Sequence, residues 1–208
     1  GKILAHTRDL DFSRGLSQRE TLWSDARPEL AQSPALQISV RTLVSMQRSG
    51  LIAQRIEIKA EQDCALTLIM SLRASTHHQA DENDPRVSAG AQDQLAWICA
   101  QSDADRCEMS AAQRAVNGLI AAQVLAQCRS HALQVTSKQE NTALGLCFEQ
   151  ALRKGETISF ERIIRYSWQP GNVQDAAADA ASLTDLNASN VPSFDDLAKE
   201  QAEHWQDF

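Results

Sequence analysis

Alternation of hydrophobic and polar residues is the clearest pattern in the chain. Successive side chains of a strand point to opposite faces, so this pattern predicts strands with one buried face. The first such run has Leu36, Ile38, Val40, Thr42, Val44 and Met46 in one parity. Further runs occupy 52–60, 64–72, 144–148 and 158–168, and turn residues such as Lys154-Gly155-Glu156 separate them. Long strands joined by short turns predict a mainly β protein, an antiparallel β-sandwich.

Three details of this pattern carry separate predictions. The stretch from Ser110 to Cys128 favours a helix by propensity, but Asn117-Gly118 interrupts it and resembles a turn, so we predict strands there. The polar segment 74–94 predicts a long surface loop. Trp168 shares the parity of the hydrophobic residues before it, which predicts that it fills the core.

The composition changes after Gln169-Pro170-Gly171, and the remainder predicts helix. Segment 175–181 is rich in Ala and Asp, and Ser193 with Asp196 is suited to cap a last helix. We therefore divide the chain into a sandwich over 1–169 and a helical tail over 170–208.

The last helix carries an apolar stripe. Leu197, Gln201, Trp205 and Phe208 follow one another at spacings of four, four and three, so they share one face. A solvent-facing helix has no reason to carry two large aromatic side chains. We predict that Leu197, Trp205 and Phe208 form an interface with a partner surface.

Charge and cysteine content exclude several classes of function. The net charge is -7, and Lys and Arg are scattered along the chain, which argues against binding nucleic acid or an anionic membrane. No apolar run is long enough to span a bilayer. The cysteines form no CxxC pair, so we predict no structural metal, no cofactor and a reducing, cytoplasmic location. The five cysteines are Cys64, Cys99, Cys107, Cys128 and Cys147.

Three segments together resemble the N-terminal domain of glycoside hydrolase family 65. They are 8–16 (RDLDFSRGL), 41–58 (RTLVSM followed by GLIAQRIEI) and 152–158 (LRKGETI) with Arg165-Tyr166-Ser167. Residues 194–197 (FDDL) to His204-Trp205 resemble the lead-in to the catalytic domain of that family.

The resemblance implies a large supersandwich, similar to galactose mutarotase, followed by a helical linker and an (α/α)6 catalytic barrel. The catalytic residues of the family lie in the barrel. This chain is then the non-catalytic N-terminal domain of a trehalose, maltose or kojibiose phosphorylase or a related α-glucoside hydrolase. Its implied partners are that barrel, a second copy in a homodimer and a carbohydrate ligand.

No group of residues makes a convincing catalytic or metal site of its own. Asp9 and Asp11 project from one face of a strand, as paired carboxylates do in glycosidases, but Arg8 and Arg14 beside them favour ordinary ion pairs. His77-His78 and the acidic residues after it offer metal-ligand atoms on a loop, and a solvated loop is the favoured interpretation. We therefore predict no catalytic residue.

Trp23 and Trp97 are the candidates for sugar contact, because aromatic faces pack against pyranose C–H groups. Three functions are compatible with the sequence. The first is a structural domain that supports a catalytic barrel, the second is a carbohydrate-binding module, and the third is a free-standing sugar-modifying enzyme.

Overall fold

The computed structural model describes residues 1–25, 35–73, 97–103, 106–115, 118–128, 134–140, 143–170 and 192–206. Within these ranges almost all of the chain is β-strand, with a helix at the end. The strands are β1 (Lys2–Asp11), β2 (Leu16–Ser24), β3 (Ala35–Val44), β4 (Leu51–Ala60), β5 (Cys64–Arg73), β6 (Trp97–Asp103), β7 (Arg106–Ala115), β8 (Gly118–Cys128), β9 (Gln134–Glu140), β10 (Ala143–Leu152) and β11 (Thr157–Pro170), and the helix is α2 (Phe194–Gln206).

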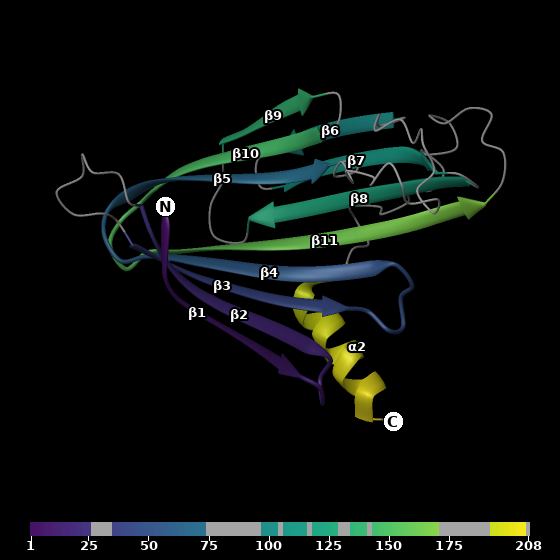
Figure 1. Ribbon diagram of the computed structural model, residues 1–208, viewed down its shortest axis with the longest axis horizontal. Coiled ribbons are helices and arrows are strands. Elements are labelled where there is room, and N and C mark those ends of the chain that lie inside the picture. Colours follow the sequence, from purple (N-terminus) through teal and green to yellow (C-terminus); the bar gives the residue numbers. More distant parts are fainter. Residues whose placement is uncertain are drawn as a thin grey trace, which may run out of the picture.

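The strands form two antiparallel sheets (Figure 1). The large sheet has the order β1-β2-β3-β4-β11-β8-β7-β6, and the small sheet has the order β5-β10-β9. Strand β11 lies between β4 and β8 and so joins the two halves of the large sheet. The predicted antiparallel β-sandwich is confirmed. The strands predicted between Ser110 and Cys128 are also confirmed, because β7 and β8 pair from Ala115↔Gly118 outward.

The main core lies between the two sheets. Ile58 and Ile158 are directly paired on β4 and β11 and are almost completely buried, as is Phe160 beside them. From the small sheet, Leu146 and Phe148 pack against this face. The Phe148 and Phe160 rings meet edge to face with centroids 5.5 Å apart. Burying each such side chain contributes about 1.5–3 kcal/mol, so this seam holds the two sheets together.

The small sheet does not cover the whole inner face of the large one. Trp168 is 51% exposed and Tyr166 is 48% exposed, although both continue the inward parity of Ile164. The prediction that Trp168 fills the core is therefore wrong. Trp168 does lie on the inner face of β11, as its parity predicts, but the small sheet does not extend over this end of the strand.

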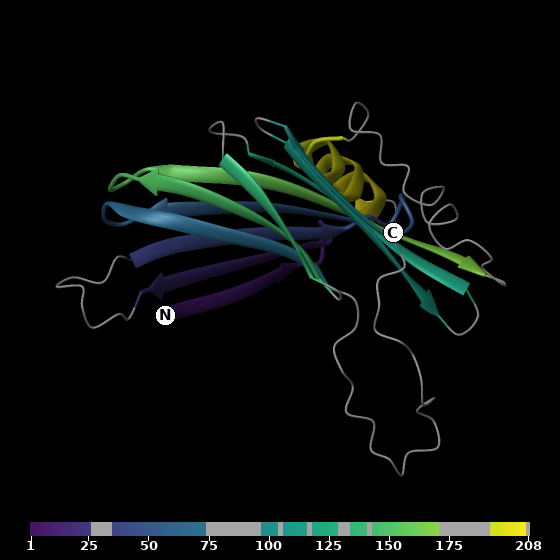
Figure 2. The ribbon, with the colours of Figure 1, turned by 90° about the horizontal axis from the view of Figure 1, so that it is seen from above.

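Helix α2 packs on the opposite, outer face of the large sheet (Figure 2). Phe194 and Leu197 are each 1% exposed and pack among residues of three strands. Those strand residues are Leu43, Leu51, Ala53 and Ile163. The predicted surface loop 74–94 and the Ala- and Asp-rich segment 175–181 lie outside the described residues. No helix in the described part of the chain is long and apolar enough to cross a membrane.

Candidate functional site

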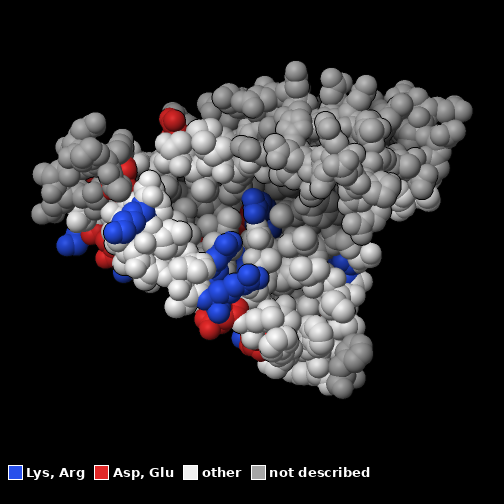
Figure 3. All heavy atoms as spheres, viewed as in Figure 1, with Lys and Arg blue, Asp and Glu red and all other residues white. Residues whose placement is uncertain are grey.

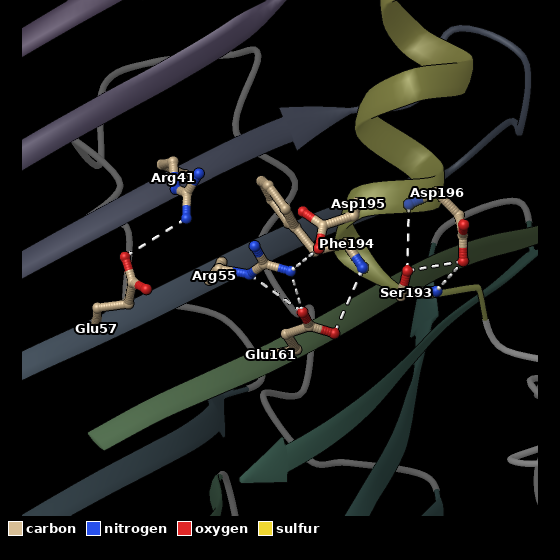
Figure 4. Close-up of polar contacts among 8 residues, drawn as sticks. All are labelled: Arg41, Arg55, Glu57, Glu161, Ser193, Phe194, Asp195 and Asp196. Atoms are coloured by element: carbon tan, nitrogen blue, oxygen red, sulfur yellow. Dashed lines mark hydrogen bonds and ion pairs between the residues drawn. The ribbon is translucent and has the colours of Figure 1, made fainter. Parts of the chain in front are cut away.

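A buried charged cluster joins the outer face of the large sheet to the start of α2 (Figure 4). Arg55 on β4 and Glu161 on β11 are direct cross-strand partners, so their side chains leave the sheet on one face. Arg55 Nη2 lies 2.5 Å from Glu161 Oε1 and 2.8 Å from Asp195 Oδ2 in the first turn of the helix. We call Arg55, Glu161 and Asp195 the helix clamp.

The helix clamp is shielded from water on its sheet side. The side chains of Arg55 and Glu161 are 16% and 6% exposed, whereas Asp195 is 72% exposed. The hydrogen bond that Arg55 donates to Asp195, together with the contact with Glu161, raises the pKa of the Arg55 guanidinium despite partial burial. Arg55 therefore stays charged and links one carboxylate of the sheet to one of the helix.

Phe194 adds two contacts to this junction. Its backbone N–H donates to Glu161 Oε2 over 3.4 Å, which gives one of the free N–H groups of the helix start an acceptor. The Arg55 guanidinium carbon lies 4.9 Å from the centre of the Phe194 ring, and that of Arg41 lies 5.7 Å from it. Arg41 is in turn paired with Glu57, at 3.4 Å.

The helix begins at a capping box. The Asp196 backbone N–H donates to Ser193 Oγ over 3.2 Å, and the Ser193 N–H donates to Asp196 Oδ2 over 3.2 Å. The hydrogen bond from the Ser193 hydroxyl, 2.7 Å long, holds the pKa of Asp196 below its usual value. The cap predicted from Ser193 and Asp196 is confirmed.

The far end of α2 is held by the turns at the end of the sheet. Gln201, 3% exposed, accepts a hydrogen bond from the Met46 backbone N–H over 3.1 Å. Arg48 is paired with Glu200 at 3.1 Å. Gly15 has φ of 57°, and a Cβ there would lie 2.0 Å from the Trp205 indole nitrogen. The close approach of the turn to Trp205 thus requires glycine.

The interface residues predicted from the stripe are only partly placed. Leu197 is buried against the sheet, Trp205 is partly buried under the β1–β2 turn, and Phe208 lies outside the described residues. The predicted stripe does not include Phe194, which is one of the most buried side chains of the helix. Phe194 precedes Leu197 by three residues, so extending the stripe by one more step would have found it.

The two tryptophans predicted to contact sugar are not brought together by any described contact. Trp23 on β2 is partly buried and packs against the main core. Trp97 begins β6 opposite Ala112, and its side chain lies outside the described residues. Sugar contact by this pair stays a prediction.

Asp11, one of the two paired carboxylates of β1, takes a structural role. Asp11 Oδ1 accepts hydrogen bonds from the Ser13 backbone and hydroxyl, at 3.0 and 2.7 Å, and from the Arg14 backbone at 3.2 Å. These bonds hold the pKa of Asp11 below its usual value, whereas a general acid needs a raised pKa. Asp11 therefore accepts the hydrogen bonds of the turn that follows β1, and the nearby charge of Arg14 also favours its ionised form. Ion pairs of Asp9 and Asp11 with arginine side chains stay a prediction. Among the described residues no group of three or more potential ligands could hold a metal ion, and His77-His78 lies outside them.

The family was decided by a comparison with protein-family models. The model for the N-terminal domain of glycosyl hydrolase family 65 matches residues 1–208. The chain belongs to this family. The resemblance noted in the three sequence segments is thus confirmed over the whole chain.

The comparison with solved structures agrees with the family 65 fold. A protein assigned as a kojibiose phosphorylase, from the human microbiome, matches with a TM-score of 0.69 and 17% identity, over 100% of this chain and 25% of that chain. The chain therefore spans about a quarter of the length of that structure.

Weaker matches also occur in the comparison. The heparan sulfate lyase HepC from Pedobacter heparinus has a TM-score of 0.41 and 11% identity, over 80% of this chain and 22% of that chain. A galactose mutarotase related enzyme from Lactobacillus acidophilus has a TM-score of 0.30 and 10% identity, over 82% of this chain and 72% of that chain. Among curated proteins no match is found.

Proposed function

We propose that this domain is the non-catalytic N-terminal part of a longer, cytoplasmic family 65 polypeptide, a disaccharide phosphorylase or an α-glucoside hydrolase. In this proposal the domain supports a catalytic (α/α)6 barrel and helps form a homodimer. The single observation that carries it is the docking of α2 on the outer face of the sandwich through the helix clamp and Phe194.

The helix clamp suits a support function because it fixes both position and direction of the helix. Arg55 connects the sheet to Asp195, and Glu161 takes the Phe194 N–H, so the helix cannot slide along the sheet without breaking charged contacts. Gln201 and Trp205 fix the other end of the helix at the turns. In the proposed longer polypeptide, the segment after α2 then leaves the sandwich at a fixed place and in a fixed direction. A second domain can be positioned only if its connection is fixed in this way.

The test uses the full-length polypeptide that contains this domain. Glu161→Gln keeps the shape of the side chain but removes its charge, so we expect a loosened helix, a lower melting temperature and a lower turnover of trehalose, maltose or kojibiose. Lys199→Ala is the matched control, because the Lys199–Glu203 pair on the outside of the same helix is 79% and 63% exposed. Unchanged activity and unchanged melting temperature in Glu161→Gln would contradict the support function.

The two alternative functions, a carbohydrate-binding module and a free-standing enzyme, need different features of the domain. A carbohydrate-binding module needs Trp23 and Trp97 to offer ring faces to sugar, and the packing of Trp23 against the core favours the support function instead. A free-standing enzyme would release glucose or glucose 1-phosphate from these disaccharides with the 208-residue chain alone. We expect neither product, and if one appears, Asp9→Asn and Asp11→Asn test whether those carboxylates are responsible.

A further inference from the structure

An open groove lies at the free ends of β1 to β4, where residues of the inner face of the large sheet meet the C-terminal end of α2. Its volume is about 590 Å³, within the usual range of small-molecule sites. Its lining includes Arg8, Arg19, Thr42 and Gln54 of the strands, one carboxylate, Asp11, and Trp205 of α2. In the space-filling view of Figure 3, Lys and Arg atoms gather near the centre, with Asp and Glu atoms directly beside them.

Two arginines face each other in this groove. Arg8 on β1 and Arg19 on β2 are direct cross-strand partners, and both line the groove. Both side chains are exposed, and within the described part of the chain neither makes an ion pair. Like charges placed directly opposite destabilise a sheet. The chain as a whole is acidic, so this basic pair is a local feature rather than a result of composition.

A third arginine extends the positive charge along the same face. Arg162 on β11 is partly buried, and its Nε and Nη2 both donate to Gln54 Oε1, the Nε bond being 2.9 Å long. Among the described residues no carboxylate pairs with it, and burial lowers the pKa of its guanidinium. The amide of Gln54 is itself oriented by a bond from Nε2 to Thr42 Oγ1, at 3.1 Å.

The floor of the groove offers hydroxyl and amide groups in one row. Ser17, Thr42 and Gln54, which line the groove, are successive partners across β2, β3 and β4 on one face of the sheet, and Arg162 on β11 is the next partner beyond them. Such a row can exchange hydrogen bonds with the hydroxyls of a ligand. Trp205 adds a partly buried aromatic side chain to the same lining.

We infer that this groove binds a small organic anion with a hydroxylated body, its phosphate or carboxylate held between Arg8 and Arg19. Two guanidinium groups side by side match the oxygens of such a group. The bound anion replaces the repulsion between the two arginines by attraction to both. The site is separate from the helix clamp, and it does not depend on the support function proposed above.

Calorimetric titration of the 208-residue chain tests the inference with four probes: glucose 1-phosphate, glucuronate, inorganic phosphate and glucose. We expect glucose 1-phosphate and glucuronate to bind. The ratio of their affinities shows whether the site prefers a phosphate or a carboxylate. Inorganic phosphate should bind about tenfold more weakly because it lacks the hydroxylated body, and glucose should not bind. Phosphate that binds as well as both sugar anions, or no binding by either sugar anion, would overturn the inference.

The variant Arg8→Ala/Arg19→Ala should lose about tenfold or more in affinity for the sugar anion. It should also melt at the same or a higher temperature than the unchanged chain without ligand, because the like-charge pair is gone. Arg153→Ala, an exposed arginine in the β10–β11 turn, is the control and should bind normally. An equal loss in Arg153→Ala would mean general charge attraction and would contradict a built site.

A protein partner is the other class of occupant for such a face. If neither sugar anion binds while the double arginine variant abolishes self-association, measured by sedimentation over a range of concentrations, the groove is a docking surface for a second copy. That result would also overturn the inference.

Discussion

Arg55 contacts two carboxylates that are distant in sequence, and this single residue connects the sheet with the helix. Its partner Glu161 is the more deeply buried of the two, so the charge on each is tolerated only because the other is present. The charged pair therefore stabilises the helix junction in addition to the apolar contacts of Phe194 and Leu197.

Removing one member of the buried pair is expected to be costly. Arg55→Met should lower the free energy of unfolding by about 3 kcal/mol, because Glu161 is left buried without its main cation. The double variant Arg55→Met/Glu161→Met should cost clearly less than the sum of the two single variants. Urea denaturation of the four proteins gives this cycle, and an additive result would contradict the pairing. The exposed pair Lys199–Glu203 is the control and should contribute less than about 1 kcal/mol.

A comparison of alanine variants at two glycines distinguishes the cost of backbone strain from the cost of a side-chain collision. Gly15 and Gly155 both have positive φ, 57° and 81°, so alanine costs roughly 1–2 kcal/mol at either position. Only at Gly15 would the new Cβ collide with Trp205, since nothing lies within 4 Å at Gly155. Gly15→Ala should therefore lower the melting temperature more than Gly155→Ala and also increase hydrogen exchange in α2. Equal effects would show that Trp205 does not rest on the turn.

Helix α2 is short, and its stability at the element scale depends on its cap and on one apolar anchor. The Ser193–Asp196 cap, the acidic first turn and the Leu197 stripe can all be predicted from the sequence by local rules. The helix clamp could not be predicted, because Arg55, Glu161 and Asp195 meet only through strand register and through the choice of sheet face. The exposure of Trp168 was missed for a related reason: alternation tells which face a side chain occupies, but not how far the opposite sheet extends.

The cap gives α2 a dependence on acid. The pKa of Asp196 lies below its unfolded value of about 3.9, so its contribution to stability is present above about pH 4 and is lost as the pH falls through the folded pKa. Asp196→Asn should flatten this part of the pH profile of helix content, followed by circular dichroism between pH 6 and pH 2. Ser193→Ala should cost about 1 kcal/mol at neutral pH. A profile unchanged by Asp196→Asn would argue against the cap.

Phe194 is the apolar anchor of the helix. Phe194→Ala should destabilise the domain by about 3–5 kcal/mol, because a nearly completely buried ring is lost between Arg55 and the sheet. Urea denaturation measures this effect. Phe12→Ala is the control, since Phe12 is 78% exposed and its loss should change stability by less than about 0.5 kcal/mol.

Trp205→Ala should loosen the far end of α2 while the sheets stay folded. Hydrogen exchange should then increase in 192–206 and stay unchanged in the strands.

On the scale of the whole molecule, the described residues form a two-sheet unit with the helix α2 fixed to its outer face. The antiparallel sandwich could be predicted from alternation and turns alone, whereas the order of the strands in each sheet could not. If α2 positions a second domain, residues 192–206 should be protected from hydrogen exchange in the full-length polypeptide. Rapid exchange there would contradict the support function.

The place of β11 also has a consequence for how the chain is made. Its partner β4 precedes it by about a hundred residues, as the pair Ile58↔Ile158 shows. At a ribosomal rate of about 5–20 residues per second, β4 leaves the ribosome roughly 5–20 s before the strand that covers its edge. During that interval β1 to β4 have an unpaired hydrogen-bonding edge and an uncovered apolar face. Both features promote aggregation. Closure of the fold therefore waits for the last strand to be translated.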